Sequence, residues 1–405
     1  MPPSLPARLV LVFAAIPLLL ASAGATAEKK YGPGASDTEI KVGNTNPYSG
    51  PASAYGTIGR AEAAYFAMIN DQGGVNGRKI NFITLDDGYS PPRTVEQVRK
   101  LVEQEQVLLM FAPLGTPPNS AIHRYMNAKR VPHIFLSTGA TKWGDPKNFP
   151  WTIGFNLNYQ AEGRIYAQYI LETKPAAKIA ILYQNDDYGK DYVKGLKDGL
   201  GDKAEAMVVA EASYEVTDPT VDSQIVSLQA SGADTFFNVT TPKFAAQAIR
   251  KAADIGWKPL EILNNVSSSV GSVLTPAGLD KSVGLITAVY FKDPTDPQWK
   301  NDADMKAYAA WFKKYYPEGN IKDGFNVSGY IMAEGLVHVL KACGDDLSRE
   351  NIMKEIANIH DLQIPMMLPG VKWNTSATDF FLIESAQLAR FDGKEWALFG
   401  KVIGH

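Results

Sequence analysis

Two short polar segments of the chain carry residues that could bind an anion. The first contains Thr116, Pro117, Pro118 and Asn119, and the second contains Ser137, Gly139, Ala140 and Thr141. Each segment leads toward the expected start of a helix, where backbone N–H groups have no partner within the helix. Together with the hydroxyls, such groups suit a negatively charged ligand, most simply a carboxylate. The alternative is that these residues only form turns and helix caps, as Ser, Thr, Pro and Gly often do.

The two polar segments follow predicted strands that a helix connects. Residues 107–110 and 134–136 are apolar runs of strand length, and Ile122, Tyr125 and Met126 between them have roughly helical spacing. A strand–helix–strand unit of this kind makes its two strands parallel. Both polar segments then lie at the carboxyl edge of one sheet, which is where open α/β sheets bind ligands.

The same alternation of strands and helices runs along most of the chain. Further strands are expected at 40–44, 80–85, 178–183, 206–210, 233–239, 260–263 and 284–291, and an antiparallel pair is expected to turn at Asp392-Gly393. This alternation predicts an α/β fold with two doubly wound, Rossmann-like domains, and 405 residues also exceed one ordinary core. We assign residues 36–154 and 286–362 to the first domain and residues 155–285 and 363–405 to the second. Such a chain crosses between its domains several times, a geometry that permits hinge closure over a cleft.

Residues 1–27 have the features of an export signal. Arg8 precedes an apolar run at 9–20, and small residues then lead to Ala27, after which we expect cleavage, with Ala23 as the alternative. The apolar run is too short to span a bilayer, and no later run approaches that length. The mature protein is therefore expected to be periplasmic and soluble. The formal net charge of the full chain, −3, gives no reason to expect nucleic acid as a partner, and a single cysteine excludes an intramolecular disulfide.

No arrangement of residues in the sequence predicts catalysis. Ser137 lacks the Gly-x-Ser-x-Gly elbow of a nucleophilic serine. The five histidines have no metal-ligand spacing, and the glycine motifs that bind nucleotide phosphates are absent. The chain is therefore not expected to be an enzyme, and we expect no cofactor and no metal.

Several motifs resemble those of the leucine/isoleucine/valine-binding family of periplasmic solute-binding proteins. They are Tyr48-Ser49-Gly50-Pro51, the glycine-rich segment 70–77, the segment 137–141 and the segment 185–189, and their order covers essentially the whole mature chain. The resemblance implies the type I periplasmic-binding fold, with two domains joined by a multi-crossing hinge. It also implies a binding protein of an ABC importer, monomeric by default, that delivers its ligand to permease subunits in the inner membrane. A ligand sensor of a signalling system, which can share this fold, is the alternative.

The resemblance also implies which residues contact the ligand. The family's carboxylate site falls on residues 116–119 and on Gly139 and Thr141, with Ser137 and Ala140 beside them. Tyr188 matches a tyrosine that closes from the second domain, and Tyr55 matches an aromatic residue that lines the cleft. The second domain is expected to add Thr240, Thr241, Asn265 and Ser267. Phe155 completes the expected site, although packing at the hinge is the competing interpretation for this residue.

The segment 264–270 bears on the class of ligand. Amino-acid-binding members of the family place an acidic residue there, which holds the ligand ammonium, but this chain has no Asp or Glu in that segment. A buried ammonium without a counter-charge would be costly. This departure favours an aromatic or other apolar carboxylate without an amine, with Tyr55 and Tyr188 as flat apolar walls. A branched-chain amino acid or an amide remains the alternative ligand.

Overall fold

Two separate sheets form the framework of the protein, as the alternation of strands and helices predicts. The computed structural model describes residues 1–4 and 29–404. Apart from residues 1–4, the predicted export signal lies outside the described residues. None of the helices within the described ranges is long and apolar enough to cross a membrane.

The first sheet has five parallel strands in the order β3-β2-β4-β5-β6. Its strands are β2 (Glu39–Asn46), β3 (Lys79–Asp86), β4 (Leu109–Phe111), β5 (His133–Leu136) and β6 (Thr152–Gly154). Helices α1 (Gly56–Asp71), α2 (Pro91–Arg99) and α3 (Thr116–Lys129) connect them. Two helices from much later in the chain, α10 (Ala303–Tyr315) and α11 (Phe325–Cys343), pack on α1, and α12 (Arg349–Ile356) packs on α11. A short parallel pair, β1 (Lys30–Tyr31) with β12 (Asp346–Leu347), ties the segment before β2 to this domain.

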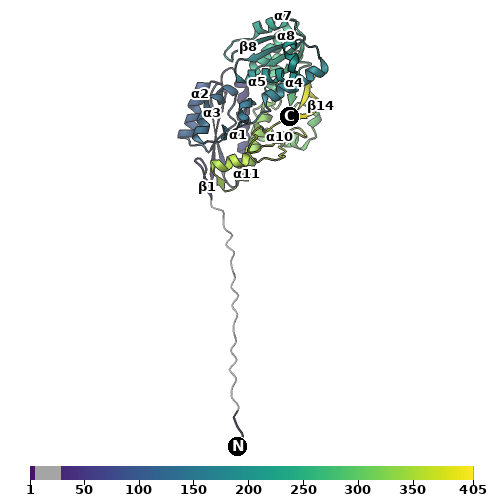
Figure 1. Cartoon of the computed structure of the whole chain (residues 1–405). Coiled ribbons are helices and arrows are strands. Elements are labelled where there is room, and N and C mark those ends of the chain that lie inside the picture. Colours follow the sequence, from purple (N-terminus) through teal and green to yellow (C-terminus); the bar gives the residue numbers. More distant parts are fainter. Residues whose placement is uncertain (5–28, 405) are drawn as a thin grey trace.

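The second sheet has seven strands in the order β14-β13-β11-β10-β9-β7-β8. Its strands are β7 (Ile179–Gln184), β8 (Val208–Tyr214), β9 (Thr235–Val239), β10 (Leu260–Leu263), β11 (Ile286–Val289), β13 (Ser385–Phe391) and β14 (Trp396–Gly404). The helices are α4 (Tyr159–Thr173), α5 (Asp187–Leu200), α6 (Ala204–Met207), α7 (Asp222–Ala230), α8 (Pro242–Asp254) and α9 (Thr275–Ala277). Strands β13 and β14 form the expected antiparallel hairpin, and the other five strands are parallel. Figure 1 shows α7, α8 and β8 at one end of the molecule and α1 and α11 toward the other.

The chain crosses between the two domains three times. The crossings lie between β6 and α4, between β11 and α10, and between α12 and β13. The expected assignment of residues 286–362 to the first domain is wrong for β11, because this strand pairs with β10 and β13 in the second sheet. The expected assignment of 363–405 to the second domain is wrong near Trp373, whose ring lies 5.5 Å from that of Phe135 in β5.

Close contact between α4 and α5 organises the part of the second domain that faces the first. A Cβ added at Gly163 would meet backbone atoms of Tyr192, and a Cβ added at Gly195 would meet the backbone of Gln160. These glycines therefore let the two helix backbones approach closely. The approach brings the tyrosines of α5 against the first turn of α4, where the rings of Tyr159 and Tyr192 stack at 4.5 Å.

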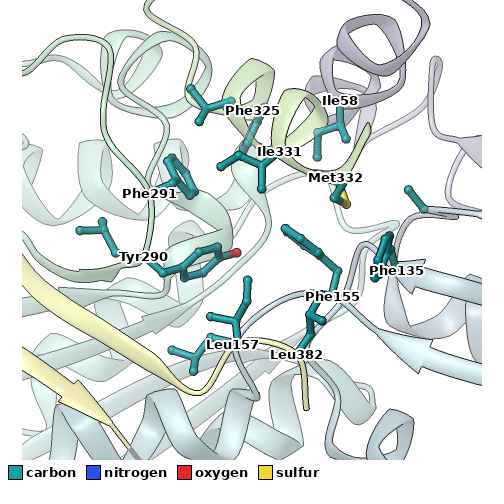
Figure 2. Packing of buried hydrophobic residues seen from close by; sticks show 14 of the residues in the cluster. Ile58, Phe135, Phe155, Leu157, Tyr290, Phe291, Phe325, Ile331, Met332 and Leu382 are labelled. Carbon is teal, nitrogen blue, oxygen red and sulfur yellow. The ribbon is translucent and has the colours of Figure 1, made fainter. Parts of the chain in front are cut away.

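Buried aromatic and aliphatic side chains continue from one domain to the other at the crossings. Figure 2 shows Phe135 and Phe155 together on one side of this region and Tyr290, Phe291 and Phe325 on the other. Both domains therefore contribute to one continuous apolar cluster. The candidate site lies at the polar edge of this cluster.

Candidate functional site between the domains

A cavity lies between the domains, at the carboxyl ends of strands from both sheets. Aromatic side chains form much of its wall: Tyr55, Tyr89, Tyr159, Tyr188, Tyr290, Phe291 and Phe325. Its volume is about 50 Å³, whereas an engineered cavity of about 150 Å³ is known to hold one benzene molecule. An aromatic ligand therefore needs the domains or the wall side chains to move, and we regard the structure as a closed state of the cleft.

The structure brings together six of the predicted site residues in the wall of this cavity. They are Tyr55, Thr116, Ser137, Tyr188, Thr241 and Asn265. The remaining predicted residues lie outside the wall: Pro117, Pro118, Asn119, Gly139, Ala140, Thr141, Phe155, Thr240 and Ser267.

Asn119 is buried and its side chain serves the loop before α3. Its amide nitrogen donates to the carbonyl oxygens of Pro113 and Gly115, each at 2.8 Å, and its Oδ1 lies 2.7 Å from His133 Nε2. No hydrogen-bonding group of this side chain is left for a ligand. Asn119 therefore shapes the loop that carries Thr116, and it does not lie in the cavity wall.

Thr141 lies outside the cavity wall and joins the two domains through hydrogen bonds. Its N–H donates to Asp191 Oδ2 in α5 at 2.6 Å, and its Oγ1 accepts from Asn158 at 2.9 Å. The neighbouring Lys142 forms an ion pair with Asp187, also in α5, at 2.6 Å. The loop after β5 is therefore anchored to the second domain.

Other predicted site residues that lie outside the cavity wall have packing or turn roles. Phe155 is buried, and its ring lies 5.4 Å from Trp373, which agrees with the competing interpretation of hinge packing. Ser267 donates to the carbonyl oxygen of Thr240, so both residues hold the second-domain loops together. Gly139 and Ala140 border a separate, smaller hollow.

The cavity end formed by Thr116 and Ser137 suits an anion. Thr116 is the first residue of α3, and its N–H has no acceptor among the described residues. Ser137 Oγ has no hydrogen-bond partner in the described part of the chain either, although the residue is only 9% exposed. Pro117 and Pro118 carry no N–H, so the helix start offers Thr116 alone among its first three residues. An anion here would also lie at the positive end of the helix dipole.

Tyr188 is held in the opposite wall by local structure. Asp186 caps α5 by accepting from the N–H groups of Tyr188 and Gly189. A Cβ at Gly189 would overlap the carbonyl group of Gln184, which explains why a glycine follows this tyrosine. The hydroxyl of Tyr188 lies 2.7 Å from the side-chain amide of Asn264, and burial raises its pKa well above the ordinary value. Tyr188 therefore stays neutral and presents its ring to the cavity.

Two hydrogen-bonded contacts close the cavity beside Tyr55 and α11. Tyr55 Oη donates to the carbonyl oxygen of Val266 at 2.9 Å. Asp323, in the loop before α11, accepts from Ser269 Oγ at 2.7 Å and from Ser272 Oγ at 2.5 Å. Burial raises the pKa of Asp323, and the two serine hydroxyls oppose this shift. These bonds connect the first domain to the loop that follows β10.

Glu162 holds the loop 264–269 through a hydrogen bond to Asn265, a role that was not predicted from the sequence. Its carboxylate accepts from Tyr166 Oη, Tyr192 Oη and the N–H of Asn265, each at 2.7 Å. Burial raises its pKa to about 7, and these donors oppose the shift. The only sequence signal for this role was an acidic residue on the apolar face of the helix at 160–172.

Glu162→Gln is expected to reduce the pH dependence of stability between pH 4.5 and about 7. In this range the folded protein keeps a proton that the unfolded chain releases, because the folded pKa is raised from 4.5 to about 7. The stabilisation is complete below pH 4.5 and is lost as the pH rises toward 7. Denaturant unfolding at about pH 5 and about pH 7.5 should show a smaller loss in the variant, by at least about 1.4 kcal/mol, which corresponds to one pKa unit. The same pH dependence in both proteins would contradict this assignment.

Several wall residues were missed because they come from distant segments. Tyr290, Phe291 and Asp293 follow β11, and Phe325 begins α11. In the sequence these residues read as ordinary core or loop positions. Only the second crossing of the chain, between β11 and α10, and the packing of α11 on α1 bring them to the cavity.

Comparisons with known proteins agree with this architecture. A family model described as periplasmic binding protein matches residues 39–395. Leu/Ile/Val-binding protein homolog 7 of Brucella abortus (strain 2308) is 24% identical over 322 residues, which are 75% of this chain and 77% of that protein. A branched chain amino acid ABC transporter from Thermus thermophilus with bound valine has a TM-score of 0.80 at 16% identity, covering 92% of this chain and 98% of that one. A fatty acid ABC transporter substrate-binding protein from Thermomonospora curvata has a TM-score of 0.76 at 22% identity, covering 93% and 95%.

Proposed function

The chain belongs to the periplasmic binding protein family, and from this premise we propose that it is the solute-binding protein of an ABC importer. It captures a small carboxylate with an apolar body, preferably aromatic, in the cavity between its domains. It then delivers this ligand to permease subunits in the inner membrane. Export through residues 1–27, a monomeric state and the absence of catalysis belong to the same proposal.

The observation that carries the proposal is the division of the cavity into an anion end and an apolar wall. The N–H of Thr116, at the start of α3, and the Oγ of Ser137, after β5, are donors without a partner in the described ranges. Rings such as those of Tyr55 and Tyr188 surround the remaining space. Hydrogen bonds to a charged group contribute about 1.5–3 kcal/mol each, so neutral donors suffice to hold a carboxylate.

A branched-chain amino acid is the second candidate ligand. The Thermus thermophilus protein was solved with bound valine, and the Thermomonospora curvata protein is described as binding fatty acids. Both of these ligand types contain a carboxylate, but their apolar parts differ. The two proteins therefore support a carboxylate as part of the ligand and do not favour one kind of apolar part. A sensor of a signalling system would use the same cavity, so it differs from an importer in its partners and not in its ligand.

A thermal-shift screen of the mature protein tests this proposal. The panel contains aromatic acids, fatty acids, amino acids and neutral amides. Because a ligand that binds only the folded protein stabilises it by mass action, apolar carboxylates are expected to raise the melting temperature most. Stabilisation by amides with no effect of any carboxylate would contradict the proposal.

A further inference from the structure

Tyr89 is a residue of the cavity wall with an unusual backbone conformation. It lies in the loop between β3 and α2, lines the cavity and is only 5% exposed. Its φ angle is +60°, a left-handed conformation that bulky residues rarely adopt. Strain of this kind persists only where the surrounding structure holds it, and it is concentrated at functional sites. The conformation of this loop therefore points to a role for the Tyr89 ring.

A buried aspartate holds Tyr89 in this conformation. Asp87 is fully buried, and its Oδ1 accepts from the N–H of Tyr89 at 2.9 Å. Its Oδ2 accepts from Thr94 Oγ1 in α2 at 2.8 Å, and its carbonyl oxygen accepts from the N–H of Ser90 at 3.0 Å. These hydrogen bonds lie on both sides of Tyr89 in the sequence, so the loop fixes the point from which the ring extends.

The ring of Tyr89 packs against the loop that leads into α3. A Cβ added at Gly115 would lie 2.4 Å from Cε2, 3.0 Å from Cζ and 3.1 Å from Cδ2 of Tyr89. Such distances are too short for a side chain at this position, so the absence of one at Gly115 makes room for the ring. The next residue is Thr116, whose N–H is available at the anion end of the cavity.

The Tyr89 ring consequently borders the anion end of the cavity. A carboxylate that accepts from Thr116 N–H and Ser137 Oγ would place its adjoining carbon atom beside this ring. A flat ring carbon or a CH₂ group can pack against an aromatic ring, whereas a branch at that carbon would compete with the ring for space. The ring has little room to turn away, because Tyr89 is almost completely buried.

We propose that Tyr89 is a specificity-determining residue, which restricts the ligand to carboxylates that are flat or unbranched at the carbon atom next to the carboxylate. This inference rests on the proposed function, because it needs the cavity to bind a carboxylate at Thr116 and Ser137. Benzoic acids, arylalkanoic acids and straight-chain acids satisfy the restriction. An α-amino acid carries a substituent on the restricted carbon, so Tyr89 disfavours the second candidate ligand.

Two isomeric acids test the restriction by isothermal titration calorimetry. The acid 2,2-dimethyl-3-phenylpropanoate carries two methyl groups next to its carboxylate, and 3-methyl-3-phenylbutanoate carries them one carbon further away. The unbranched reference is 3-phenylpropanoate. The wild type is expected to bind the first isomer about tenfold or more weakly than the second, because a single methylene group against the wall of an apolar pocket changes binding by this factor or more.

Three variants show whether the Tyr89 ring causes this difference. Tyr89→Ala removes the ring, and Tyr89→Asn removes it with a residue that adopts a positive φ more readily. Both are expected to bring the affinities of the two isomers together. Tyr89→Phe removes only the hydroxyl and is expected to keep the difference. Thermal unfolding of each variant without ligand shows that it is folded before it is titrated.

The possible outcomes separate the inference from the proposed function. Equal binding of the two isomers by the wild type would overturn the inference and leave a carboxylate-binding protein, and this comparison needs no variant. A difference that persists in both Tyr89→Ala and Tyr89→Asn, or that disappears in Tyr89→Phe, would also overturn it, because the ring would not be the cause. Failure of all three acids to bind would contradict the proposed function and the inference together.

Discussion

Replacing Asp323 with alanine is expected to weaken ligand binding by about 100-fold or more. Asp323 belongs to the first domain and accepts hydrogen bonds from Ser269 and Ser272 of the second, and it is only 4% exposed. Hydrogen bonds to a charged group contribute about 1.5–3 kcal/mol each, so losing two costs the closed state about 3 kcal/mol or more. Calorimetric titration with the carboxylate that best stabilises the wild type measures this loss directly.

A double-mutant cycle with Ser272→Ala separates this domain contact from local damage. Asp323 also accepts from the N–H of Phe325 at the start of α11, so Asp323→Ala alone disturbs that helix. Ser272→Ala leaves α11 untouched and is expected to weaken binding about tenfold, since it removes one of the two donors. In the Asp323→Ala background the same change should have little further effect. Additive losses in the double variant would mean that the two residues do not act through their mutual contact.

Trp373→Ala is expected to lower the free energy of unfolding by about 3–5 kcal/mol, the usual cost of removing a large buried aromatic side chain. Trp373 is fully buried, and its ring lies 5.5 Å from Phe135 and 5.4 Å from Phe155. A Cβ at Gly335 would collide with this ring, so the indole fills its site completely. Denaturant unfolding followed by circular dichroism measures the change.

Phe155→Leu is the matched control for the role of the aromatic cluster formed by Trp373, Phe135 and Phe155. It keeps an apolar side chain and is expected to destabilise the protein by only about 1 kcal/mol, with unchanged ligand affinity. Weaker ligand binding in Phe155→Leu at nearly wild-type stability would instead show that Phe155 contributes to ligand binding, as expected from the sequence.

Local sequence patterns predicted the elements of this fold well. The apolar runs at 80–85 and 260–263 became β3 and β10, and the Asp392-Gly393 turn joins the expected hairpin. These features depend on periodicity and turn chemistry within a few residues. The domain assignment of β11 could not be predicted in this way, because it depends on which distant strands pair with it.

The candidate site was predictable where it follows strand ends and less so elsewhere. Thr116 and Ser137 were predicted to lie together because parallel strands place their carboxyl ends at one edge, and both line the cavity. Asn119 and Thr141 have suitable chemistry as well, but the protein uses their groups in its own hydrogen bonds. Asp293 was missed because it reaches the cavity only through the second crossing between the domains.

The central claim is that the cavity between the domains binds a carboxylate. Calorimetric titration of the wild type with an apolar acid and its primary amide, such as 3-phenylpropanoate and 3-phenylpropanamide, tests this claim most directly, because the pair differs only in the group expected at Thr116 and Ser137. The account predicts that the acid binds about tenfold or more tightly than the amide, since hydrogen bonds to a charged acceptor are the stronger ones. Equal or tighter binding of the amide would contradict it.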